Sequence, residues 1–237
     1  MTAEEAVRAA LGEVLDPELD RSVVSLEFVR AIELDGPDVR VELRLPTFWC
    51  SPSFAYMMVA DARSAIEAVP GVRRARVELV DHFAAERVTE GVDEGRPFRA
   101  VFPGEADGEL DELRRRFRLK AFVVRQEPVL RAACAAAGEA GAAAWPLGRG
   151  EPEGVRADGW EEYLARRRDL GMPEGPGELA FTDPQGRPLD PAGMGHYLRL
   201  SRSMRVSLES NTEFCTGLLA ARYGGGVEAW QGKEVAA

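Results

Sequence analysis

The feature that most constrains the fold is a strand pattern that passes directly into a helix pattern. Residues 39–45 read V-R-V-E-L-R-L, and this alternation of apolar and polar side chains is typical of a half-buried strand. Residues 53–69 are long, apolar and helical in pattern. Ser51 suits the N-cap, and Pro52 suits the first helical position because it has no N–H to leave unpaired. The chain is therefore expected to leave a strand and enter a helix here.

Cys50 lies in this junction. Free backbone N–H groups and the positive end of the helix dipole favour an anion at a helix N-terminus, and so favour the thiolate form of a cysteine. Cys50 is therefore a candidate metal ligand or nucleophile. The local pattern is equally compatible with a small apolar side chain that packs beside Phe48 and Trp49.

The same unit extends through the first third of the chain, which opens with capping-box spacing at Thr2 and Glu5. Its expected elements are a helix over 3–15, a strand over 28–33, a strand over 39–45, a helix over 53–69 and a strand over 72–80. Strands joined by a tight turn pair antiparallel, and a later strand returns after a helical crossover. We expect an α+β fold with a mixed three-stranded sheet and helices.

The rest of the chain is expected to be mostly helical, with its last helix starting at the capping-box spacing of Ser210 and Glu213. Pro128 is expected to split the first long helical stretch. Weak periodicity and many Gly, Glu and Asp residues suggest a connection between the two parts. The predicted division is a domain over 1–85, a linker over 86–108, a helical domain over 109–224 and a flexible tail over 225–237.

Composition excludes several classes of protein. No apolar run approaches the ~20 residues of a membrane span, and no signal peptide is recognisable, so we expect a cytoplasmic protein with no membrane partner. The formal net charge of −10 disfavours nucleic-acid binding. The local basic cluster over 114–120 is expected to pair with Asp111 and Glu112 on a solvated helix. Three widely spaced cysteines give no disulfide framework.

Of the other two cysteines, one is a candidate metal ligand. Cys215, like Cys50, lies near the start of an expected capped helix. If the two thiols converge, two thiolates with one or two nitrogen or oxygen ligands would suit iron or zinc. The alternative is that Cys215 packs in a helical core beside Phe214 and Leu218. Cys134, in an alanine-rich helix, is interpreted as a small buried residue.

The two histidines have different prospects. His82 follows an expected strand, from which its ring could reach a site at the mouth of the sheet as a metal ligand or acid–base group. The alternative is a hydrogen-bonded structural histidine. His196 is interpreted as a surface or packing residue. Hydrolase and nucleotide-binding motifs are absent from the sequence.

The order of these elements and motifs resembles the SufT/PaaD-type iron–sulfur assembly domain over roughly residues 3–80. The resemblance rests on D-P-E-L at 16–19, S-L-E-F-V at 25–29, Thr47 and Cys50. It implies that Asp16, Glu18, Thr47 and Cys50 line one small polar pocket. It also implies that Cys50 handles iron or an Fe–S cluster.

The sequence departs from the family pattern at three places. Ser51 separates Cys50 from the proline that usually follows it directly, and Pro46 stands where a second threonine is common. Glu27 places a carboxylate in a turn that usually has none, and this carboxylate is either a metal ligand or simply exposed. The D-P-E motif also has a structural interpretation, as an Asx-type turn that ends a helix.

The whole chain resembles long members of this family that accompany soluble diiron monooxygenases, which implies a role in maturing a client metalloenzyme. One thiolate cannot hold a cluster. The other ligands would come from Cys215, from Cys50 of a second copy in a homodimer, or from a client or Fe–S assembly protein. The leading hypothesis is a non-catalytic iron or iron–sulfur assembly factor. The alternative is an interaction module or chaperone for an oxygenase subunit, and a thiol enzyme ranks third because Cys50 has no motif-defined base.

Overall fold

The structure is a computed structural model that describes residues 2–104 and 110–224. Its contacts divide the chain into two compact units. Met1–Leu110 and Ser210–Ala237 form one unit, called the sheet unit below, and Asp111–Glu209 form the other, called the helical unit. The sheet unit is therefore discontinuous in sequence.

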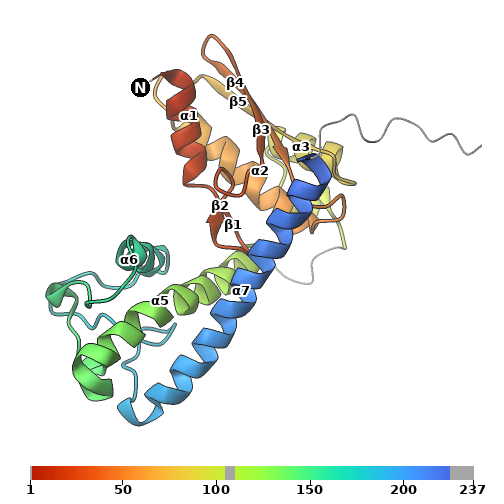
Figure 1. Ribbon diagram of the computed structural model, residues 1–237. Coiled ribbons are helices and arrows are strands. Elements are labelled where there is room, and N and C mark those ends of the chain that lie inside the picture. The colour runs from red at the N-terminus through yellow and green to blue at the C-terminus, as the bar shows by residue number, and fades with distance from the viewer. Residues whose placement is uncertain (1, 105–109, 225–237) are drawn as a thin grey trace, which may run out of the picture. The chain divides into compact units, whose positions relative to one another are not determined.

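The sheet unit has the expected α+β fold, with a mixed three-stranded sheet and covering helices (Figure 1). Its elements are α1 (Ala3–Gly12), β1 (Leu15–Asp16), β2 (Arg21–Ser22), β3 (Val29–Asp35), β4 (Asp38–Arg44), α2 (Pro52–Glu67), β5 (Arg74–Val80), α3 (Ala85–Asp93), α4 (Phe98–Val101) and the last part of α7 (Met194–Tyr223).

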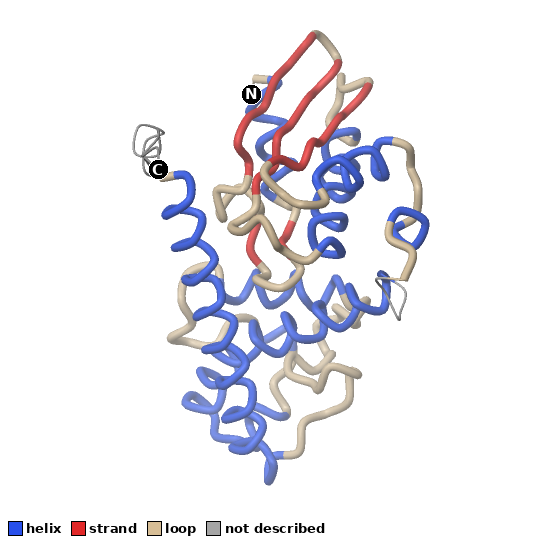
Figure 2. Tube along the Cα trace, turned by 90° about the vertical axis from the view of Figure 1, so that its right-hand side faces the viewer, coloured by secondary structure: helices blue, strands red, loops and turns tan. Residues whose placement is uncertain are grey.

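The sheet has the order β3-β4-β5, shown in red in Figure 2. Val41 in the central strand lies opposite Ile32 in the antiparallel β3 and opposite Val77 in the parallel β5. The carboxyl ends of β4 and β5 consequently meet at one edge of the sheet. The residues that follow these two strands are thereby placed close together.

The alternation of apolar and charged side chains along β4 explains how this sheet packs. Val39, Val41 and Leu43 are buried in the apolar core, which also receives the buried side of α2. Arg40 points away and bonds the Glu78 carboxylate at 2.7 Å. One face of the strand is therefore apolar and the other is covered by ion pairs, as the sequence pattern predicts.

Two predicted helix starts are confirmed. Thr2 Oγ1 accepts from Glu5 N at 3.2 Å and Thr2 N donates to a Glu5 carboxylate oxygen at 2.7 Å, which completes the capping box. Pro52 is in the first turn of α2, with Ser51 at the N-cap. The Ser51 hydroxyl, however, bonds the Ser53 hydroxyl at 2.8 Å rather than capping a backbone N–H.

The structure differs from the expected linker and from the expected last helix. The segment over 86–104 contains most of α3 and all of α4, and Val88, Val92, Phe98 and Phe102 join the sheet unit's core. Val88 and Val92 are four residues apart on α3 and mark its buried side, but the glycine and acidic residues of the segment concealed this pattern. Ser210 and Glu213 lie inside the continuous α7 and cap nothing. The rest of the linker, 105–109, and the predicted flexible tail over 225–237 lie outside the described residues.

The helical unit contains α5 (Leu110–Ala143), η1 (Leu147–Arg149), α6 (Gly159–Asp169), η2 (Pro191–Gly193) and the first part of α7. Helical structure continues through Pro128, and the backbone leaves helical geometry instead at Gly138, where φ is 70°. Tyr163, Phe122 and Phe181 are fully buried at its centre. Of the helices in the described part of the chain, none is long and apolar enough to cross a membrane.

Candidate functional site

The candidate site lies at the edge of the sheet where the parallel strands β4 and β5 end. The loop with Thr47 and Cys50 follows β4, and His82 follows β5. In sheets with parallel strands, the carboxyl ends of the strands are a recurrent place for binding sites. The fold therefore brings together residues that are distant in the sequence.

Thr47 and Cys50 are in direct contact. The Thr47 Oγ1 and Cys50 Sγ atoms are 3.2 Å apart, and Trp49 N donates to the same Thr47 oxygen at 3.2 Å. Since the oxygen already accepts the Trp49 N–H, its own proton is free to point at the sulfur. A threonine hydroxyl in this position stabilises a thiolate and fixes the direction of the Cys50 side chain.

His82 holds the backbone of the cysteine loop. Its ring is buried, its Nδ1 accepts from Ala84 N at 3.1 Å, and its Nε2 lies 2.7 Å from the Cys50 carbonyl oxygen. We therefore assign the proton to Nε2, which donates to Cys50. Burial lowers the pKa of His82, so the ring stays neutral near pH 7. With both nitrogens engaged, the ring has no lone pair left for a metal in this arrangement, which favours the structural interpretation.

The D-P-E-L segment forms an Asx turn between β1 and β2. One Asp16 carboxylate oxygen accepts from Glu18 N and from Leu19 N, both at 2.8 Å. Asp16 is buried, and this burial raises its pKa to about 6, against the opposite effect of the two backbone hydrogen bonds. The Asx turn is confirmed, but it connects β1 to β2 and does not end α1, which ends at Gly12. Its carboxyl group titrates near pH 6.

Cys215 belongs to the sheet unit and is half-buried against its core. Burial raises the pKa of its thiol to about 11, and the negative charges of Asp16, Cys50 and Glu18 add to the shift. The charges that act on Cys215 thus come from the cysteine loop and from the Asx turn. At neutral pH it is a thiol, and a metal ion would have to displace its proton.

The C-terminal end of α7 is anchored at the same edge of the sheet. Arg222 donates to the Asp81 carbonyl oxygen at 2.8 Å and to the Leu45 carbonyl oxygen at 3.4 Å. Leu219 is buried in the sheet unit's core, and Tyr223 packs against this core. Sequence analysis missed Arg222, because no local pattern marks an arginine that bonds carbonyl groups so distant in the chain.

Glu27 lies in a groove of about 470 Å³ between the 25–27 turn and α7. The groove is lined by Ser25, Leu26, Glu27, Glu213, Thr216, Gly217, Leu219 and Ala220. Glu27 is exposed and has a φ of 59°, a left-handed conformation that suits the turn. Glu213, which sequence analysis treated only as a capping residue, supplies a second carboxylate to this groove.

An exposed aromatic cluster borders Cys50. It consists of Phe48, Trp49 and Phe83, whose side chains are 42%, 73% and 43% exposed. The Trp49 ring centroid is 4.9 Å from that of Phe48 and 5.4 Å from that of Phe83. Contiguous exposed aromatic side chains mark surfaces that bind other proteins. The sequence pattern of two consecutive aromatic residues is compatible with packing around Cys50, whereas in the structure Phe48 and Trp49 are exposed.

The described residues form no complete metal cage. Across 2–104 and 110–224, no group of three or more His, Cys, Asp and Glu side chains is arranged to hold a metal ion. Cys50, Cys215 and Asp16 therefore do not together form a ligand set for one metal ion, and Cys50 contributes a single thiol that contacts Thr47. The chemistry of this site is that of a partial ligand set, which a partner would have to complete.

Comparison with known proteins supports the resemblance for one segment of the chain. Residues 4–79 match the sequence model of a family described as iron-sulfur cluster assembly protein. A relative from Deinococcus radiodurans, named iron-sulfur cluster carrier protein, is 39% identical over 75 residues. The aligned part is 32% of this chain and 21% of the relative, so the likeness covers a small part of each. The matched segment includes Asp16, Thr47 and Cys50 and ends before Cys215.

Proposed function

We propose that this protein is an iron–sulfur cluster or iron assembly factor that passes its cargo to a client metalloenzyme and turns over no substrate itself. The observation that carries the proposal is the Thr47–Cys50 contact at the carboxyl end of β4, with the negative charges of Asp16 and Glu18 acting on the Cys215 thiol. The family match over residues 4–79 and the name of the Deinococcus relative support the same role.

A partial ligand set suits a carrier. Cys50 provides a sulfur ligand whose direction is fixed by Thr47, and Cys215 provides a thiol that binds only if it loses its proton. A full set of four thiolates would hold the cargo too tightly for transfer. The missing ligands come from a client, from an Fe–S assembly protein or from a second copy of the chain.

The exposed cluster of Phe48, Trp49 and Phe83 would contact the client. Because this cluster lies beside Cys50, a client bound to it would be close to the cargo held by Cys50. The resemblance to long forms that accompany soluble diiron monooxygenases makes such an enzyme the first client to test. The second candidate function, a chaperone without metal, rests on this same aromatic surface and leaves Cys50 structural.

Anaerobic reconstitution tests cargo binding. The full chain is incubated with ferrous iron and sulfide, desalted, and assayed for bound iron, visible absorption and oligomeric state. Cys50→Ser should abolish the sulfur-to-iron absorption and most bound iron, and Cys215→Ser should lower both. Cys134→Ser is the matched control, because Cys134 is a half-buried thiol in the helical unit. Equal iron in the Cys50 and Cys134 variants would refute cargo binding at this site.

Transfer to a client separates the two candidate functions. A diiron monooxygenase is produced with wild-type protein, with the Cys50→Ser variant, or alone, and its iron content and activity are measured. The assembly role predicts that the Cys50 variant resembles absence of the protein. Client loading that survives Cys50→Ser but fails when the protein is absent would favour the chaperone. Full loading without the protein would refute both.

A further inference from the structure

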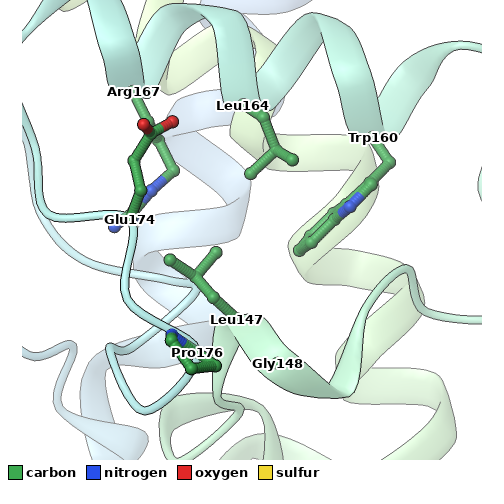
Figure 3. A pocket seen from close by; sticks show the side chains of 7 residues that line it. All are labelled: Leu147, Gly148, Trp160, Leu164, Arg167, Glu174 and Pro176. Carbon is green, nitrogen blue, oxygen red and sulfur yellow. The ribbon is translucent and has the colours of Figure 1, made fainter.

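The aromatic cluster of Phe48, Trp49 and Phe83 leaves much ring surface in water, since Trp49 alone is 73% exposed. The apolar cavity of the helical unit is different (Figure 3). It measures about 250 Å³, and Trp160 in its wall is only 8% exposed. Single exposed apolar side chains are normal on a protein surface, whereas contiguous ones mark an interaction site. Among the described residues, the aromatic surface that calls for a covering partner therefore lies beside Cys50.

The chain leaves α7 next to this cluster. Arg222 lies in the last turn of α7 and donates to the Asp81 carbonyl oxygen at 2.8 Å. Phe83 follows Asp81 by two residues, and its N donates to the Phe48 carbonyl oxygen at 3.1 Å. The end of α7 is therefore tied to the two loops that carry the aromatic rings.

The segment that follows α7 has one aromatic residue. Residues 225–237 read G-G-V-E-A-W-Q-G-K-E-V-A-A, in which Trp230 comes eight residues after Arg222. Eight extended residues span about 28 Å, whereas Phe83 is only about 7 Å of chain away from the Asp81 carbonyl that Arg222 holds. Three consecutive glycines at 224–226 allow the chain to reverse its direction directly after α7. Trp230 can therefore reach the rings of the cluster.

We propose that residues 227–235 fold back over the exposed aromatic cluster and place the Trp230 ring against Trp49 and Phe83. Aromatic rings attract one another in offset and edge-on arrangements, so a group of rings complements Trp230 better than one isolated ring does. Phe214, 67% exposed on α7, is such an isolated ring. Because a short linker joins the two partners, their effective concentration is on the order of mM, which supports a reversible contact.

This contact occupies the surface proposed above for the client. The 227–235 segment and a client would compete for it, so a client would displace Trp230 as it approaches Cys50. This competition rests on the proposed function, but the contact itself does not. Its test uses metal-free protein without a client, so failure of the contact and failure of the assembly role are distinguishable.

Hydroxyl-radical footprinting of the full chain measures how accessible each ring is. Trp49 should be oxidised about threefold more slowly in the wild type than in Trp230→Ser. Trp230→Phe keeps an aromatic ring and should retain most of this protection. Gln231→Ser is the matched control within the segment and should behave as the wild type does. Phe214 is the internal reference, and its oxidation rate should be the same in all four proteins.

Two footprinting results would overturn the proposal. One is an equal oxidation rate of Trp49 in the wild type and in Trp230→Ser. The other is protection by Trp230 of Phe214 instead of Trp49, which would place the segment on the outer side of α7.

Photo-crosslinking locates the contact independently. The photoreactive residue p-benzoylphenylalanine replaces Trp230, and the cross-linked peptides are identified by mass spectrometry. We expect links within one chain to the peptide that contains Phe48 and Trp49 or to the peptide that contains Phe83. Links confined to the helical unit would contradict the proposal. Links between labelled and unlabelled copies in an isotope mixture would also contradict it, because they would make a second copy the occupant.

Discussion

The two units treat buried polar groups in opposite ways. In the helical unit, Gln126 is fully buried and uses its whole side-chain amide, which bonds Thr182 through both N and O and also bonds Tyr197 and Tyr163. In the sheet unit, Asp16 uses one oxygen in a turn and keeps a pKa near neutrality. A closed network gives rigidity, whereas a partly satisfied cluster keeps ligand capacity.

The two units also differ in where the partners of their polar groups come from. The helical unit closes its network with its own residues, and among the described side chains of this Gln126–Tyr163–Arg167 network only the Arg167 Nε has no hydrogen-bond partner. The sheet unit takes Cys215 and Arg222 from α7 and still presents an incomplete ligand set with an exposed aromatic border. The first arrangement is typical of a structural core, and the second is what a transient cargo site requires.

The largest expected effect comes from breaking the closed network. Arg167→Ala removes three hydrogen bonds and leaves the carbonyl oxygens of Ala180 and Pro173 without this donor, so we expect a loss of about 3 kcal/mol or more in the unfolding free energy. Hydrogen exchange should show the loss in the helical unit. Arg168→Ala, at a 51% exposed side chain, is the control and should change little. Similar losses in both variants would mean that the network adds no stability.

The next effect is a pH dependence confined to the sheet unit. The pKa of Asp16 is raised from 3.8 to about 6 in the folded state. Folding therefore favours the protonated form, and its contribution to stability is present below pH ~4 and lost as the pH rises to ~6. The loss amounts to roughly 2–3 kcal/mol.

Hydrogen exchange at several pH values, corrected for intrinsic rates, measures this loss. Asp16→Asn keeps an acceptor for the two turn N–H groups and should abolish the pH dependence. Amides of the helical unit serve as the internal reference. A dependence that persists in the Asn variant would assign it to another group.

Thiol alkylation tests whether the pKa of Cys215 in the sheet unit is raised. Because the pKa of Cys215 is raised from 9.0 to about 11, its thiolate fraction near pH 7 should be roughly a hundredfold lower than that of an unperturbed thiol. Alkylation rates by mass spectrometry should therefore be slow at Cys215. Asp16→Asn removes one of the negative charges that raise this pKa and should speed the reaction. Rapid alkylation of Cys215 in the wild type would show that burial and the nearby negative charges do not raise its pKa.

The smallest effect is expected at the first helix. Thr2→Ala removes the side-chain half of the capping box on α1 and should lower the unfolding free energy by about 1 kcal/mol. Urea denaturation measures it. Thr2→Ser retains the hydroxyl and should restore most of the loss. An effect on the amides of the helical unit would indicate that the two units unfold together.

Local sequence patterns were sufficient to predict the main helices and strands of the sheet unit. They did not predict that the last part of α7 belongs to this unit. The alternation over 39–45 and the proline at 52 each fix a conformation through neighbouring residues, so strand β4 and the start of α2 were predictable. The capping-box spacing at Ser210 was misleading, because its residues are tolerated inside the continuous helix α7.

The candidate site was predictable only in part. The sequence resemblance grouped Asp16, Thr47 and Cys50, but the link of Cys215 to them rested on a helix start that does not exist. The role of His82 depends on two hydrogen bonds that form only after β5 and the cysteine loop are in place. The Gln126–Thr182 pair spans 56 residues and leaves no periodic trace in the sequence.

The discontinuity of the sheet unit has a consequence for synthesis on the ribosome. Residues up to 110 emerge first, but the stretch from 210 to 223 that supplies Cys215 and Arg222 follows the entire helical unit. At bacterial and eukaryotic elongation rates, the roughly 100 residues between these two segments delay the second one by roughly 5–20 s. A nascent or truncated chain would thus present Cys50 without its second thiol. Under the assembly role proposed above, acquisition of cargo would be coupled to translation through the last turns of α7.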